Sequence, residues 1–121
     1  MSDSIRLSSV TVDCPNAPEL AAFYAEITRG TVVSQSEAWA TVNGPNGRID
    51  FQTVPGYRPP TWPDPTASVQ MHLDFFVDDL EATGARAVAA GATRLDFQPN
   101  SDHCLASADP AARRQRPRPR S

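Results

Sequence analysis

A histidine and a carboxylate stand two residues apart in the segment QMHLDFFV, at a spacing that suits chemistry. Alternate residues of a strand share a face, so His72 and Asp74 are expected on the same side. Imidazole exchanges protons near neutral pH and binds transition metals, so His72 is a candidate metal ligand or acid-base group. Alternatively, His72 lines a cavity and hydrogen-bonds Asp74. The carboxylate could orient the imidazole, accept a hydrogen bond from a ligand, or face solvent.

Aromatic side chains are expected close to His72. Residues 55–68 begin with five prolines in eleven residues, which lack the amide donors of a sheet strand, and an extended, semi-rigid linker is predicted. Such a linker would carry Tyr57 and Trp62 as a stiff aromatic rim, and Trp39 would add a wall. The alternative is that these rings cover a sheet edge and fill the core, as most buried aromatic residues do.

The elements that position these residues can be predicted from periodicity. Residues 6–14 alternate between apolar and polar, which predicts a strand with one apolar face made of Val10, Val12 and Cys14. Asn16 and Glu19 then form a capping box, and apolar residues at helical spacing predict a helix over residues 17–29. Gly30 is expected to end this helix.

Three strands are predicted after this helix, over residues 31–34, 39–42 and 48–54. Ile49 and Phe51 in the last of them would face the helix. The opposite face would then carry Arg48, Asp50 and Gln52. The local order is therefore β-α-β-β-β.

The same pattern restarts in the second half of the chain, with a strand over 71–77, a helix over 80–90 and a strand over 93–97. Asp78 or Asp79 would cap the helix, and Gly91 would end it. Superposing SVTVDCPNAPELAAFY on HLDFFVDDLEATGARA pairs Ser9 with His72, 63 residues later, and the apolar faces coincide. This match indicates an internal duplication.

Two β-α-β-β-β modules in one short chain resemble the vicinal oxygen chelate superfamily of glyoxalase I, bleomycin-resistance proteins and extradiol dioxygenases. The segments DCPNAPELAAFYAEI, GPNGRIDFQTVPGYRPPTWPDP and QMHLDFFVDDLEATGARAVAAGATRL are similar to those of small glyoxalase-like domain proteins. The resemblance implies an α+β fold in which two curled sheets form a cup with the ligand on its concave face. Residues 1–110 would be this domain, with module one at 5–54, linker 55–68 and module two at 69–110.

In the metal-using members of that superfamily, the first and last strands of each module supply the ligands. Carried onto this chain, these places fall on Ser9, or on Val10 after a one-residue slip, and on Gln52 and His72. Only His72 suits a divalent metal well. A divalent metal cofactor bound through His72 stays open, because a lone histidine is a poor metal site.

The fourth ligand place falls in a segment of unusual composition. A turn is expected at residues 108–111, but the following ARRQRPRPRS has no apolar alternation and is rich in proline and arginine. The last strand of module two is therefore expected to be missing or altered, and residues 111–121 to be a disordered basic tail. A reading-frame change or an unusual truncation is one hypothesis for this end.

Composition limits the partners. The chain has 121 residues, enough for one domain, and all eleven cationic residues are arginines. Up to residue 110 the net charge is −8, from 6 Arg against 14 Asp and Glu, and the remaining segment is +5. An acidic body with a short basic tail argues against specific nucleic-acid binding, and no apolar run is long enough for a membrane span. Without a secretory signal, the cytoplasm is expected, with Cys14 and Cys104 reduced.

Three functions remain open from these observations. The first is a protein that binds a small molecule between Trp39, Tyr57, Trp62, His72 and Asp74, without a complete metal site and without chemistry. The alternative, which rests on the resemblance, is a metal-dependent lyase, isomerase or dioxygenase that uses His72 and Gln52. The third is a degraded relative with no specific ligand. A homodimer is expected, because a missing strand would expose a sheet edge.

Overall fold

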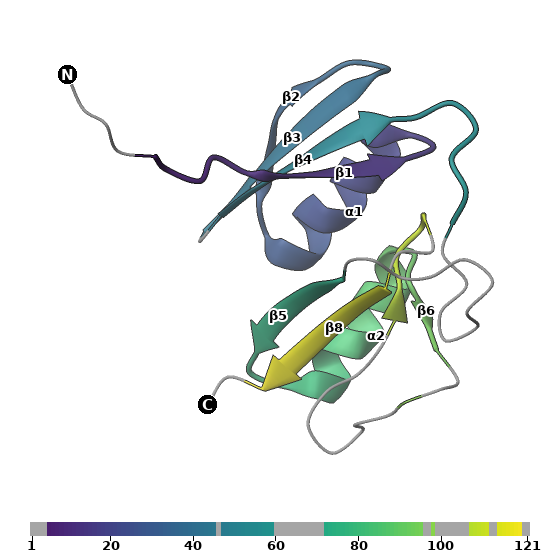
Figure 1. The fold of residues 1–121 in the computed structure, drawn as a ribbon. Helices are drawn as coiled ribbons and strands as arrows, with labels where there is room; N and C mark the ends of the chain where they lie inside the picture. Colours follow the sequence, from purple (N-terminus) through teal and green to yellow (C-terminus); the bar gives the residue numbers. More distant parts are fainter. Residues whose placement is uncertain are drawn as a thin grey trace. The chain divides into compact units, whose positions relative to one another are not determined.

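The computed structural model describes residues 5–45, 47–59, 72–95, 98 and 107–111, and the backbone of residues 114–119. The chain forms two compact units, Met1–Pro55 and Gly56–Ser121. Each unit contains a helix and a sheet, labelled in Figure 1. The structure therefore has the mixed α+β composition that the sequence predicts.

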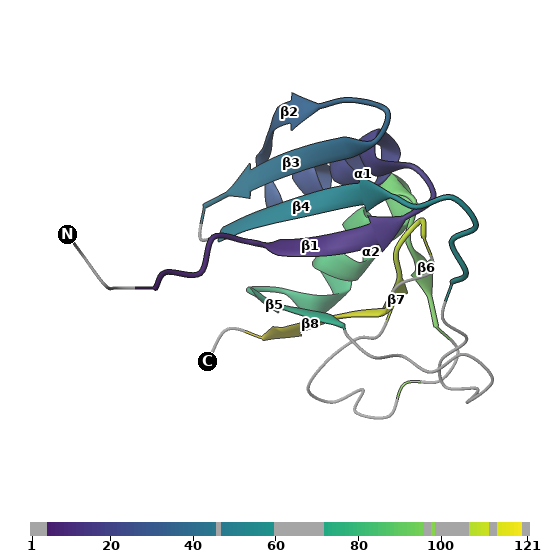
Figure 2. The same cartoon turned by 45° about the horizontal axis from the view of Figure 1, so that its top comes forward.

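The first unit has the predicted order β-α-β-β-β. Its elements are β1 (Val10–Cys14), α1 (Ala17–Thr28), β2 (Thr31–Gln35), β3 (Trp39–Gly44) and β4 (Gly47–Thr53). The sheet runs β1-β4-β3-β2, and β1 lies parallel to β4 while the other neighbours are antiparallel. Figure 2 shows α1 on one face of this sheet.

The core of the first unit lies between α1 and the sheet. Val12 and Cys14 of β1 are buried, as their alternation predicts, whereas Val10 at the start of the strand is exposed. Tyr24 of α1 stacks on Phe51 of β4, with ring centroids 5.6 Å apart. Because Phe51 faces the helix, residues of opposite parity in β3 and β4 must point to the other side of the sheet. That side carries the polar side chains of the candidate site.

The two ends of α1 differ in how well the sequence predicts them. Asn16 is the N-cap, and its Oδ1 accepts the Glu19 amide at 3.0 Å, as expected. The expected stop at Gly30 is wrong by one residue, because Arg29 takes the left-handed conformation with φ 57°. Gly30 is required for a different reason: a Cβ there would lie 2.7 Å from the Asn43 carbonyl oxygen of β3.

The second unit repeats the arrangement of the first. Its elements are β5 (Leu73–Val77), α2 (Leu80–Ala90), β6 (Thr93–Arg94), β7 (Ser107–Ala108) and β8 (Arg114–Pro119). Its strand order, β5-β8-β7-β6, places the first strand beside the last, as in the first sheet. Asp79 is the N-cap of α2, and Gly91, with φ 124°, is its C-cap. This shared topology supports an internal duplication.

The last strand corrects a prediction. The sequence predicts no regular strand in residues 111–121, yet the backbone of Arg114–Pro119 pairs in parallel with β5, and Pro117 stands opposite Phe75. Pro117 and Pro119 have no amide hydrogen, and residues two apart direct their backbone groups to the same edge of a strand. The prolines therefore remove donors from one edge of β8 only, and the amides of residues 116 and 118 remain at the other edge. The strand is therefore altered in composition rather than missing, and the second sheet continues past residue 110.

Within the described parts of the chain, neither helix has the length and apolar character that a membrane span requires.

Candidate functional site

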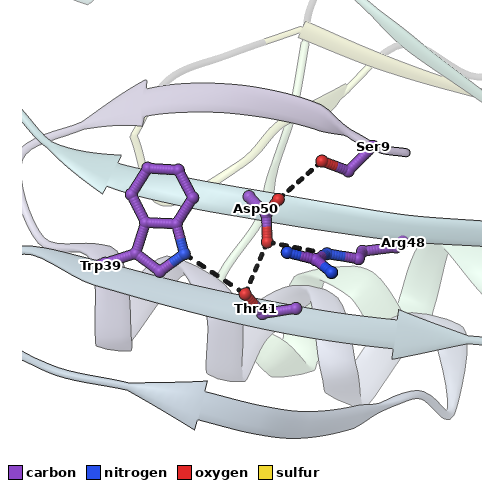
Figure 3. Close-up of polar contacts among 5 residues, drawn as sticks. All are labelled: Ser9, Trp39, Thr41, Arg48 and Asp50. Carbon is purple, nitrogen blue, oxygen red and sulfur yellow. Dashed lines mark hydrogen bonds and ion pairs between the residues drawn. The ribbon is translucent and has the colours of Figure 1, made fainter. Parts of the chain in front are cut away.

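A hydrogen-bonded cluster occupies the face of the first sheet that lies opposite α1 (Figure 3). At its centre is Asp50 of β4, whose side chain is only 4% exposed. Its Oδ2 accepts the Ser9 hydroxyl at 2.6 Å, and its Oδ1 accepts the Thr41 hydroxyl at 2.5 Å and Arg48 Nε at 3.2 Å. The strand register explains the cluster, because Thr41 lies directly opposite Asp50 and Arg48 is two residues away on the same face.

The ionised form of Asp50 is stabilised by the residues around it. Burial by itself disfavours the ionised form, but the hydrogen bonds from Ser9, Thr41 and Arg48, with the guanidinium charge, outweigh it. The pKa of Asp50 therefore lies below its ordinary value of 3.8. The group is an anion at neutral pH and accepts hydrogen bonds only, so both hydroxyls must donate to it.

Trp39 and Gln52 share this face. They are cross-strand partners in β3 and β4, and Trp39 Nε1 donates to the Thr41 hydroxyl oxygen at 3.3 Å. The half-buried indole is thus connected through Thr41 to Asp50. The Gln52 side chain lies on the exposed side of its strand. The structure therefore brings together two of the predicted site residues in the first unit.

His72 and Asp74 meet in the second unit, as their spacing predicts. His72 Nε2 lies 3.3 Å from Asp74 Oδ2, and the two side chains are 30% and 27% exposed. His72 directly precedes β5, and Asp74 is the second residue of that strand. This is the contact that an imidazole oriented by Asp74 would make, and the role of Asp74 stays a prediction.

The predicted aromatic rim is only partly within the described residues. The Tyr57 hydroxyl donates to the Ala111 carbonyl oxygen at 3.2 Å, which connects the start of the linker to the turn before β8. In that turn Asp109 Oδ1 accepts the Ala111 amide at 2.8 Å. Trp62 lies outside the described residues. The rim around a ligand stays a prediction.

Comparison with known proteins agrees with this architecture. The model of the glyoxalase-like domain family matches residues 9–115. The chain belongs to this family. No curated protein sequence matches it.

Solved structures share the fold of this glyoxalase-like domain. A glyoxalase/bleomycin resistance protein/dioxygenase family enzyme from Burkholderia phytofirmans has a TM-score of 0.72 at 18% identity, covering 93% of this chain and 97% of its own. A bleomycin resistance determinant encoded on the transposon Tn5 has a TM-score of 0.64 at 16% identity, covering 97% and 99%. A fosfomycin resistance protein from Mesorhizobium loti has a TM-score of 0.70 at 10% identity, covering 100% and 94%.

In the first unit, the places that the resemblance assigns to metal ligands carry neutral side chains. The Ser9 hydroxyl is committed to Asp50, and Gln52 offers a neutral amide. His72 supplies one imidazole, while the β8 segment RQRPRP contains no histidine, cysteine or carboxylate. In the described ranges, no three or more His, Cys, Asp or Glu residues group so as to hold a metal ion.

Sequence reasoning placed Asp50 on the correct face but did not select it as a site residue. Ser9 and Arg48 were also placed without being predicted as members of a cluster, and Thr41 was missed altogether. A carboxylate between two helix-facing apolar residues, Ile49 and Phe51, was the available signal. Its partners could not be found from the sequence alone, because they depend on the register of three strands.

Proposed function

We propose that this glyoxalase-like domain binds a small, partly aromatic molecule without a complete metal site and without chemical conversion. One observation carries the proposal: the half-buried Trp39 is tied through Thr41 to a buried carboxylate, on a sheet face that no helix of its unit covers. An indole held in this way can stack on a ligand with little loss of conformational freedom. Gln52, opposite Trp39, supplies an adjacent amide.

Two further observations support a small-molecule ligand bound without a complete metal site. In the first unit, the places that the resemblance assigns to metal ligands carry the neutral donors of Ser9 and Gln52. Two proteins with the same fold are named for resistance to the small molecules bleomycin and fosfomycin. The part that Tyr57, Trp62, His72 and Asp74 take in binding, and the location in the cytoplasm, stay predictions from the sequence.

A fluorescence titration tests the proposal. The chain contains two tryptophans, so Trp62→Phe leaves Trp39 as the only indole reporter. We expect a panel of small aromatic compounds to include members that shift or quench Trp39 emission saturably. The signal should survive EDTA, because no metal is required. Trp39→Leu in the otherwise native chain should lower the affinity of the same compounds at least tenfold, measured by calorimetry.

The affinity of Trp62→Phe is compared with that of the native chain by calorimetry, so that any contribution of Trp62 to binding is measured separately. If no compound in the panel perturbs Trp39, or if binding disappears with EDTA, the proposal is wrong.

The alternative function is a metal-dependent lyase, isomerase or dioxygenase, and the contact between His72 and Asp74 favours it. A carboxylate that holds one imidazole nitrogen is the usual support for a histidine that ligates metal through the other. Metal analysis of protein purified without chelator separates the two functions. Stoichiometric zinc, nickel, iron or manganese that is lost in His72→Ala would establish the alternative.

A further inference from the structure

Arg48 is held by Asp50 through its Nε, and part of its side chain is exposed. Its Nε donates to the buried Asp50 at 3.2 Å, while 44% of its side chain is exposed. A guanidinium has five N–H donors, so this bond leaves four on the two terminal nitrogens. Among the described residues, Arg48 makes no other hydrogen bond or ion pair. The terminal nitrogens therefore present a fixed pair of donors on the exposed side of the cluster.

The same cluster fixes the position of an aromatic ring. The Asp50 carboxylate carries no proton, so the Thr41 hydroxyl must donate its hydrogen to Asp50. The Thr41 oxygen is then left to accept a hydrogen bond from another group. Trp39 Nε1 fills that role at 3.3 Å. The indole of Trp39 and the guanidinium of Arg48 are thus both held by the Thr41–Asp50 pair, as Figure 3 shows.

Trp39 and Arg48, both held by the Thr41–Asp50 pair, can recognise two different parts of one ligand. A planar ring can stack on the Trp39 indole, and an oxyanion accepts two parallel hydrogen bonds from a guanidinium. The negative charge of Asp50 reduces the attraction of Arg48 for an anion. The ring contact must therefore contribute to affinity, and a bare oxyanion should bind poorly.

We infer that the ligand of this glyoxalase-like domain is an aromatic oxyanion, a ring that carries a carboxylate or a phosphonate. Arg48 takes the oxyanion and Trp39 takes the ring. This inference rests on the proposed function, because it names the class of molecule bound at the same face.

Ligand-observed saturation-transfer NMR on the full chain tests the inference with matched probes. The pairs are indole-3-acetate with indole-3-acetamide, and benzoate with benzamide; phenylphosphonate separates phosphonate from carboxylate recognition, and acetate tests the bare oxyanion. We expect the aromatic anions to bind at least tenfold more tightly than their amides, and acetate to give no saturable signal. The preference should weaken at high salt in the native protein, which requires no variant.

Arg48→Gln should remove the preference for the anion over its amide, and Arg48→Lys should retain part of this preference. Circular dichroism checks that both variants fold. Equal binding of anion and amide to the native protein, with retained dependence on Trp39, overturns the inference but leaves the proposed function standing. If no aromatic probe of either charge binds, both are wrong.

Discussion

At the scale of single residues, the buried Asp50 organises the polar face of the first sheet. It accepts from two hydroxyls and a guanidinium, and through Thr41 it also positions Trp39. Hydrogen bonds to a charged group contribute more to stability than bonds between neutral groups. Because all of these donors converge on one carboxylate, its loss should affect stability and the geometry of the site together.

Asp50→Asn is expected to destabilise the protein by about 1–3 kcal/mol at neutral pH. The substitution removes the counterion of Arg48, and it places an amide NH2 group, which donates hydrogen bonds, where an acceptor is needed. Chemical denaturation measures this free energy of unfolding. Glu37→Gln changes an exposed carboxylate in the loop before β3 and is the matched control, expected within about 0.5 kcal/mol of the native protein.

The stabilisation from Asp50 should depend on pH with a defined sign. The pKa of Asp50 is lower in the folded state than its ordinary value of 3.8, so the unfolded state binds more protons in acid. The stabilisation is fully present above the unfolded pKa and is lost as pH falls through the lowered folded pKa. The difference in unfolding free energy between native and Asp50→Asn protein should therefore shrink as the pH falls below about 4. A difference that grows in acid would contradict this assignment.

At the scale of elements, helix caps and register determine where the polar face forms. Asn16 caps α1 as the sequence predicts, and Asp79, one of the two residues predicted for the role, caps α2, because capping depends on side chains within a few residues. The end of α1 is different. Arg29, not Gly30, takes the left-handed conformation, and Gly30 lies against β3, which is remote in sequence.

Gly30→Ala should therefore destabilise the protein by about 1–3 kcal/mol, because the added Cβ would meet the Asn43 carbonyl oxygen at 2.7 Å. Gly47→Ala, at the start of β4, is the matched control, since a Cβ there meets nothing within 4 Å. It should leave stability unchanged or raise it slightly, by restricting the unfolded chain. Thermal denaturation of both variants checks the contrast, and equal losses would show that the close approach to β3 is unimportant.

At the scale of the whole molecule, exposed apolar residues before β1 support the predicted homodimer. The strand whose absence would have exposed an edge in module two is present, because β8 lies between β5 and β7. Instead, Ile5 and Leu7, just before β1, are 98% and 87% exposed. Contact with a second copy would remove this apolar surface from water.

Analytical ultracentrifugation should find a dimer at micromolar concentration, and Leu7→Glu should shift the protein to a monomer. Val88→Glu, at an exposed apolar position of α2, is the control and should remain dimeric. A monomeric native protein at high concentration would count against the dimer.

Local patterns in the sequence are enough to predict the order of elements from β1 to β6, the N-cap of α1, the buried Val12 and Cys14 of β1, and the contact of His72 with Asp74. These features follow from spacings of two to four residues, which local geometry converts into a face or a cap. Only the tertiary structure decided the last strand and the Asp50 cluster. In β8, pairing with β5 overrides the poor strand propensity of proline and arginine. The cluster joins Ser9, Thr41 and Asp50, whose contacts depend on how β1 and β3 align with β4, and no local pattern specifies that register.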